Sequence, residues 1–142
     1  MEDRSTIDKN LAVKSQIDLV LIIDDDADWC FIAQMILQRA GFGKSIITAN
    51  NGQEGIKTLQ TISEKGEKLP DIIFLDIKMP VMDGFEFLEA ITKLTEPDLS
   101  RTRIYICSSS FHPKDKEKAN LYPIAGFIPK PLTVDILREI SV

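Results

Sequence analysis

The chain has little cysteine, histidine or tryptophan, and these shortages exclude several kinds of site. Of its 142 residues, two are cysteine, one is histidine and one is tryptophan. Cys30 and Cys107 are too few and too dispersed to build a disulfide framework or a zinc site. We expect both to be small buried hydrophobic residues. The single histidine, His112, is expected to be exposed and to carry no chemistry.

Positive charge and long apolar segments are also scarce. The net charge is −5 and the pI is about 4.9, which argues against general nucleic-acid binding. No apolar run approaches the ~20 residues that cross a bilayer, and residues 1–16 lack the apolar core of a secretion signal. We therefore expect no nucleic-acid partner, no membrane partner and a reducing, cytoplasmic location.

Short apolar runs alternate with segments of helical periodicity along the chain. The runs predict five strands, at residues 19–23, 45–49, 71–75, 103–107 and 126–129. Helices are predicted at about 28–40, 51–63, 83–94, 113–121 and 133–140. Several strands are apolar at consecutive positions, which is typical of strands covered on both faces. The alternation predicts an α/β fold, in which right-handed crossovers place helices on both faces of a parallel sheet.

The domain organisation is expected to be simple. Residues 1–16 show no periodicity and predict an N-terminal tail that need not be ordered. Residues 17–142 predict one domain, because their length suits a single core.

Polar residues follow four of the predicted strands at their carboxyl ends. These residues are Asp24 with Asp25, Asp76, Ser108 and Lys130. In a parallel α/β sheet the functional crevice lies beyond this edge, so we expect the five side chains to meet there. Carboxylate oxygens in an incomplete cage suit Mg²⁺, with Mn²⁺ as a substitute. A carboxylate beside the ion can act as a nucleophile toward phosphorus, and a lysine can neutralise phosphoryl charge.

Four motifs in this order resemble the response-regulator receiver domains of two-component signalling. They are "LIIDDDAD", "IIFLDIKMPVMDGFEFL", "ICSSS" and "GFIPKPL", and the similarity in spacing extends from about Leu19 to Ile140. The resemblance implies the CheY-like, flavodoxin-like fold, a doubly wound five-stranded parallel sheet with strand order 2-1-3-4-5.

The resemblance also implies roles for the residues at the strand ends. Asp76 would be the phosphoacceptor, assisted by Lys130. Mg²⁺ would be bound by Asp76, directly by Asp25, largely through water by Asp24, and by the backbone carbonyl of Lys78.

Further implied features concern the response to phosphorylation. Ser108 would move toward the phosphoryl group, and Phe127, at the position of the family's aromatic switch residue, would fill the vacated space. Phe127 as plain core packing is an open alternative. The Lys130–Pro131 peptide bond would be cis.

The partners implied by the resemblance are proteins. A sensor histidine kinase or a histidine phosphotransfer protein would supply the phosphoryl group. A downstream protein target would bind the face formed by residues 113–121, 126–129 and 133–140. The chain would act either as a diffusible signal or as a phosphate carrier, and in neither case as an enzyme acting on another substrate.

Two alternatives remain open on sequence grounds. One is a receiver-like binding module that is never phosphorylated. The other is a phosphatase of the haloacid-dehalogenase type, whose first-strand motif Asp-x-Asp-x-Thr/Val is not matched, because Asp28 stands four residues after Asp24.

Three neighbours of the acidic pair receive simpler interpretations. Asp28 is expected to cap the first helix, and Asp26 is expected to be a solvated acid. Trp29 is expected to be a packing residue whose fluorescence reports metal binding.

Overall fold

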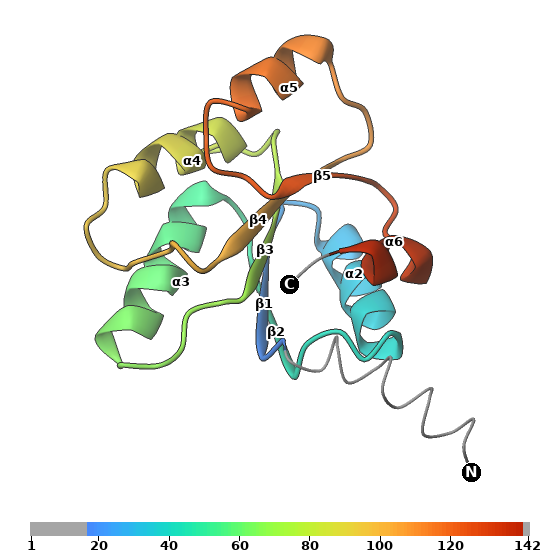
Figure 1. The fold of residues 1–142 in the computed structure, drawn as a ribbon, viewed down its shortest axis with the longest axis horizontal. Coiled ribbons are helices and arrows are strands. Elements are labelled where there is room, and N and C mark those ends of the chain that lie inside the picture. The colour runs from blue at the N-terminus through green and yellow to red at the C-terminus, as the bar shows by residue number, and fades with distance from the viewer. Residues whose placement is uncertain (1–16, 141–142) are drawn as a thin grey trace.

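The computed structural model describes residues 17–140 as a five-stranded parallel sheet with helices on both faces (Figure 1). The strands are β1 (Leu19–Ile23), β2 (Ser45–Ala49), β3 (Ile72–Asp76), β4 (Arg103–Ser108) and β5 (Gly126–Pro129). The helices are α2 (Ala27–Arg39), α3 (Gly52–Glu64), α4 (Gly84–Thr92), α5 (Pro113–Ala119) and α6 (Val134–Glu139). The strand order is β2-β1-β3-β4-β5, which confirms the predicted fold class. The tail predicted at residues 1–16 lies outside the described residues.

The sheet separates two apolar cores. Helices α2 and α6 cover one face, and α3, α4 and α5 cover the other (Figure 1). Alternate residues of the central strands face opposite sides: Ile22 and Phe74 belong to the first core, whereas Ile23 and Leu75 belong to the second. The central strands are therefore buried on both sides, as their uninterrupted apolar sequences predict.

Two strands end one residue later than predicted. Asp76 is paired with Cys107, and Ser108 is paired with Pro129, so each polar residue is the last of its strand instead of the first of a loop. Ladder pairing fixes the backbone of both residues at the carboxyl edge of the sheet. Asp76 and Ser108 therefore lie on strands, which are more rigid than the loops in which the sequence placed them.

The start of α2 also differs from the prediction. Asp26, not Asp28, is the N-cap, and its Oδ1 accepts a hydrogen bond from the Trp29 N–H at 3.1 Å. The physical reason is that the helix begins at Ala27, so Asp28 already lies in the first turn, where its charge favours the helix dipole. Thr133 caps α6, and its Oγ1 accepts a hydrogen bond from the Ile136 N–H at 3.1 Å. Gly41 follows α2 with φ 64°, as expected of a helix stop.

None of the helices in residues 17–140 is both long and apolar enough to span a membrane.

Gly84 fits the first turn of α4 closely against β3, and this contact predicts a sensitive position. A Cβ at Gly84 would collide with the carbonyl oxygen of Asp76 and come within 3.0 Å of the Ile77 Cα. Because both obstacles are backbone atoms, we expect Gly84→Ala to lower the free energy of unfolding by about 1–3 kcal/mol, measured by urea denaturation. Gly126→Ala is the control, since a Cβ there meets only the Tyr105 ring at 3.5 Å. Equal losses in the two variants would contradict the prediction.

Candidate metal and phosphoacceptor site

Three carboxylates converge at the carboxyl edge of the sheet. Asp24 and Asp25 directly follow β1, and Asp76 is the last residue of β3. One carboxylate oxygen of each residue lies within 4.8 Å of a carboxylate oxygen of the other two. Asp24 is 2% exposed, and its Oδ1 accepts a hydrogen bond from the Asp26 N–H at 2.9 Å. Asp25 is exposed, so the cluster is open to water on that side. The structure therefore brings together the three acids that the sequence singled out.

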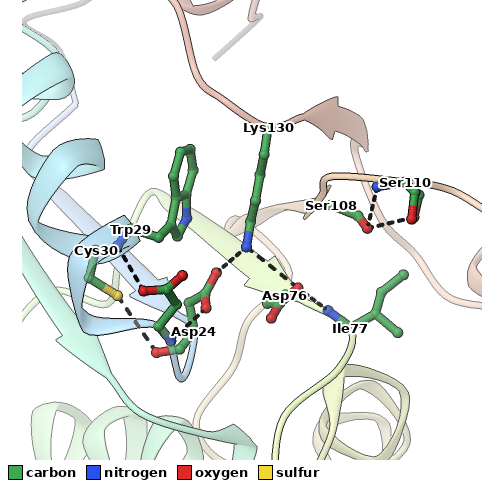
Figure 2. Close-up of polar contacts among 9 residues, drawn as sticks. Asp24, Trp29, Cys30, Asp76, Ile77, Ser108, Ser110 and Lys130 are labelled. Atoms are coloured by element: carbon green, nitrogen blue, oxygen red, sulfur yellow. Dashed lines mark hydrogen bonds and ion pairs between the residues drawn. The ribbon is translucent and has the colours of Figure 1, made fainter.

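Asp76 is held in one orientation and has an altered acidity. Its Oδ1 accepts a hydrogen bond from the Ile77 N–H at 2.9 Å (Figure 2). Burial, with the negative charge of Asp24, raises the pKa of Asp76 to about 6, although Lys130 acts in the opposite direction. Like charges in a partly dry site favour the neutral form of one of them, and a bound cation would reverse this effect.

Lys130 supplies the positive charge of the site. Its Nζ lies 2.6 Å from Asp24 Oδ2 and 3.7 Å from Asp76 Oδ1, and its side chain is 16% exposed (Figure 2). Burial lowers the pKa of Lys130, but the hydrogen bond and charge of Asp24 outweigh it, so the pKa is raised and the ammonium persists. The Lys130–Pro131 peptide bond is cis, as expected.

Ser108 and Phe127 lie outside this charged cluster. The Ser108 hydroxyl donates a hydrogen bond to the Ser110 carbonyl at 2.7 Å, away from Asp76 (Figure 2). The Phe127 ring packs edge-on against Phe111 with a centroid distance of 5.3 Å, and Lys116 Nζ lies 5.6 Å from the Phe127 ring. The expected meeting of five side chains therefore includes the three acids and the lysine, but not the serine hydroxyl in this conformation.

Comparisons with known proteins identify the family. The sequence model of the response regulator receiver domain matches residues 20–141. The chain belongs to this family.

The relatives of this receiver domain include both kinases and regulators. It is 37% identical over 122 residues to the sensor histidine kinase CheAY of Helicobacter pylori, covering 86% of this chain and 14% of that protein. It is 30% identical over 121 residues to the two-component response regulator ARR10 of Arabidopsis thaliana, covering 85% of this chain and 20% of that protein. The chain thus corresponds to a small part of these relatives' length.

Solved structures share the fold of this receiver domain. A two-component response regulator from Cytophaga hutchinsonii matches with a TM-score of 0.78 and 30% identity, over 85% of this chain and 91% of that chain. The chemotaxis protein CheY4 of Vibrio cholerae matches with a TM-score of 0.70 and 27% identity, over 85% of this chain and 92% of that chain.

Receiver domains bind Mg²⁺ at an acidic pocket, and the carboxylates of this chain fit the ion. The cluster of Asp24, Asp25 and Asp76 offers hard oxygen donors and leaves a side open for water, as Mg²⁺ requires. The neighbouring thiols do not compete as ligands. Burial raises the pKa of Cys30 to about 11 and that of Cys107 further, so both remain protonated, in agreement with their predicted role as buried hydrophobic residues.

Two residues near the site were interpreted too simply from the sequence. The Trp29 ring lies 5.1 Å from Lys130 Nζ, a contact beyond the packing role expected of it. Asp26 was expected to be a solvated acid, yet it caps α2. The sequence contained a signal for a cap, an Asp just before the apolar stripe, but Asp26 and Asp28 both satisfy it. No sequence pattern signalled the contact between Trp29 and Lys130, which are 101 positions apart.

His112 is exposed, as expected, and its Nδ1 accepts a hydrogen bond from the Lys114 N–H at the start of α5. Lys78 is exposed as well.

Proposed function

We propose that this receiver domain accepts a phosphoryl group on Asp76 from a histidine kinase or a histidine phosphotransfer protein, with Mg²⁺ bound by Asp24, Asp25, Asp76 and the carbonyl of Lys78. The observation that carries the proposal is the position of the Asp76 carboxylate, whose Oδ1 lies 3.7 Å from Lys130 Nζ and which has an oxygen within 4.8 Å of those of Asp24 and Asp25. The relatives, which include a sensor histidine kinase and a response regulator, support a phosphohistidine donor.

The geometry assigns separate tasks to the two oxygens of Asp76. Oδ1 is engaged by the Ile77 N–H and faces Lys130, which leaves Oδ2 to attack phosphorus. The new P–O bond forms as the P–N bond to the donor imidazole breaks, and the electron pair of that bond remains on the imidazole nitrogen. Reversal of the same step would return the phosphoryl group to a histidine, so the site suits a phosphate carrier as well as a signal.

Charge neutralisation is the main requirement of this reaction, because charge spreads over the three equatorial phosphoryl oxygens. Mg²⁺, when bound, supplies two positive charges at the carboxylate cluster. Lys130 supplies a third as a point charge, and its raised pKa keeps it available at neutral pH. The Ser108 hydroxyl would donate to a phosphoryl oxygen after leaving the Ser110 carbonyl.

Intact-mass measurement after incubation with acetyl phosphate and Mg²⁺ tests the proposal. An aspartyl phosphate adds ~80 Da to the chain. Persistent absence of the adduct, with acetyl phosphate and with a panel of phosphorylated kinases and phosphotransfer proteins, would favour a binding module that works by contact alone. Comparison of forward with reverse transfer across the panel separates a diffusible signal from a carrier.

The response to phosphorylation is expected to reach the face formed by α5, β5 and α6, where a downstream protein would bind. Ser108 and Phe127 belong to neighbouring strands, and Phe127 contacts Phe111 in the segment before α5. A structure with fluoroberyllate and Mg²⁺ bound is expected to show the Ser108 hydroxyl turned toward Asp76 and the Phe127 ring moved inward. Unchanged positions of both side chains would contradict this part of the proposal.

A further inference from the structure

Among the described residues, the ammonium of Lys130 contacts two carboxylates and one uncharged ring. Asp24 Oδ2 and Asp76 Oδ1 contact it as anions, whereas the Trp29 ring presents its face with the centroid 5.1 Å from Nζ (Figure 2). The face of an indole attracts a cation more strongly than any other side-chain ring, and the attraction grows where water is excluded. At 16% exposure the Lys130 side chain meets that condition.

Trp29 is well anchored for such a role. It lies in the first turn of α2, and its backbone N–H donates a hydrogen bond to Oδ1 of the N-cap Asp26 at 3.1 Å. Its ring is half-buried and packs against the core between α2, α6 and the sheet. The ring therefore belongs to the rigid scaffold, whereas a lysine side chain has four rotatable bonds and loses considerable entropy when it is held in one place.

A bound divalent cation would compete with Lys130 for its two carboxylate partners, but not for the Trp29 ring. A divalent ion at the acidic cluster would draw on the charge of Asp24 and Asp76, and it would repel the ammonium. The attraction of the Trp29 face is unaffected by this competition, because the ring is not a ligand for a hard cation. The ring can therefore keep Lys130 in place when both carboxylates are engaged.

We propose that Trp29 is a positioning residue, which holds the Lys130 ammonium beside Asp76 through its aromatic face so that the ammonium meets the incoming phosphoryl oxygens. The inference rests on the proposed function of Asp76. It assigns to Trp29 a role that simple packing does not predict.

Three variants separate the aromatic role from packing. Trp29→Phe keeps a weaker aromatic face, and Trp29→Leu keeps apolar volume without any face. Phe31→Leu is the matched control, because Phe31 lies in the same helix, is 64% exposed and undergoes the same kind of substitution. Thermal unfolding of all four proteins checks that they are folded under the assay conditions.

The first measurement is the rate of adduct formation with acetyl phosphate and Mg²⁺. We expect Trp29→Leu to be about 10-fold slower than the wild type and Trp29→Phe about 3-fold slower. Phe31→Leu is expected to match the wild type. The graded order follows the strength of the aromatic face. Because side-chain volume falls in the same order, the second measurement is needed to separate the two roles.

The second measurement needs no phosphodonor. The Trp29 ring current should shift the Lys130 Hε resonances upfield in the NMR spectrum of the wild type and of Phe31→Leu, less in Trp29→Phe, and not in Trp29→Leu. A Lys130 resonance that is the same in the wild type and Trp29→Leu would overturn the inference. An adduct that forms equally fast in these two proteins would also overturn it, whereas no adduct in the wild type would overturn the proposed function itself.

Discussion

Replacement of Asp76 by Asn is expected to abolish the ~80 Da adduct that acetyl phosphate and Mg²⁺ produce on the wild type. An amide oxygen is not a nucleophile toward phosphorus under these conditions, and Asn also removes one of the three carboxylates of the cluster. The change is nearly isosteric, so the hydrogen bond from the Ile77 N–H to Oδ1 can persist. The predicted loss is therefore chemical and not a consequence of unfolding.

The same variant has an expected effect on stability whose sign follows from the pKa of Asp76. That pKa is about 6 in the folded protein, against an ordinary value of 3.8 for an aspartate. The folded state therefore binds more protons, so this group makes stability fall as the pH rises from about 4 to 6. Asp76→Asn removes the penalty. We expect it to be more stable than the metal-free wild type by about 1–2 kcal/mol at pH 7, a figure reduced for partial solvent screening.

Urea denaturation at pH 4 and pH 7, with and without Mg²⁺, measures this effect. The advantage of the variant should be small at pH 4 and full at pH 7, and Mg²⁺ should stabilise the wild type more than the variant. Asp28→Asn is the control, because this exposed carboxylate lies in the first turn of α2, outside the metal cluster. An adduct that survives in Asp76→Asn, or one that Asp28→Asn abolishes, would refute the assignment of the phosphoacceptor.

Replacement of Lys130 by Met is expected to slow adduct formation by about 100-fold and to destabilise the metal-free protein by about 2–4 kcal/mol. Methionine keeps most of the apolar stem and removes the charge. Asp24, which is 2% exposed, would lose the ammonium that now lies 2.6 Å from its Oδ2. A buried carboxylate without its partner is costly, because no water replaces the lost interaction.

The control for Lys130 is an exposed ion pair. Lys44→Met breaks a contact of 3.4 Å with Asp18, in which the lysine side chain is 72% exposed. We expect a loss below about 1 kcal/mol and no effect on adduct formation. Mg²⁺ should narrow the difference in stability between Lys130→Met and the wild type, and it should leave the smaller difference of Lys44→Met unchanged, since the ion supplies charge only at the acidic cluster. Equal losses in the two variants would show that Asp24 does not depend on Lys130.

Much of the charged site could be predicted from the order of residue types along the chain. A parallel sheet places the carboxyl ends of its strands at one edge, so acids at positions 24, 25 and 76 and a lysine at position 130 had to come near one another. The structure confirms that they do. The roles of these residues in phosphate chemistry remain proposals that the variants above test.

Other features depended on conformational detail that residue order does not contain. Both Asp26 and Asp28 precede the apolar stripe of α2, and the choice of cap depended on which residue has extended backbone angles; Asp26 does, with φ −89° and ψ 102°. Ser108 stands at the expected strand end, yet a rotatable hydroxyl has several acceptors within reach and bonds to Ser110 here.

The order of residues was sufficient to predict the α/β class, the covered strands and the edge of the sheet where the charges gather, because periodicity and strand polarity are local properties that repeat along the chain. The contact of the Trp29 ring with the Lys130 ammonium could be seen only in the folded chain, since it joins the first turn of α2 to the residue after β5 across 101 positions. Side-chain packing between distant elements depends on rotamers and helix orientation, which no single segment of sequence specifies.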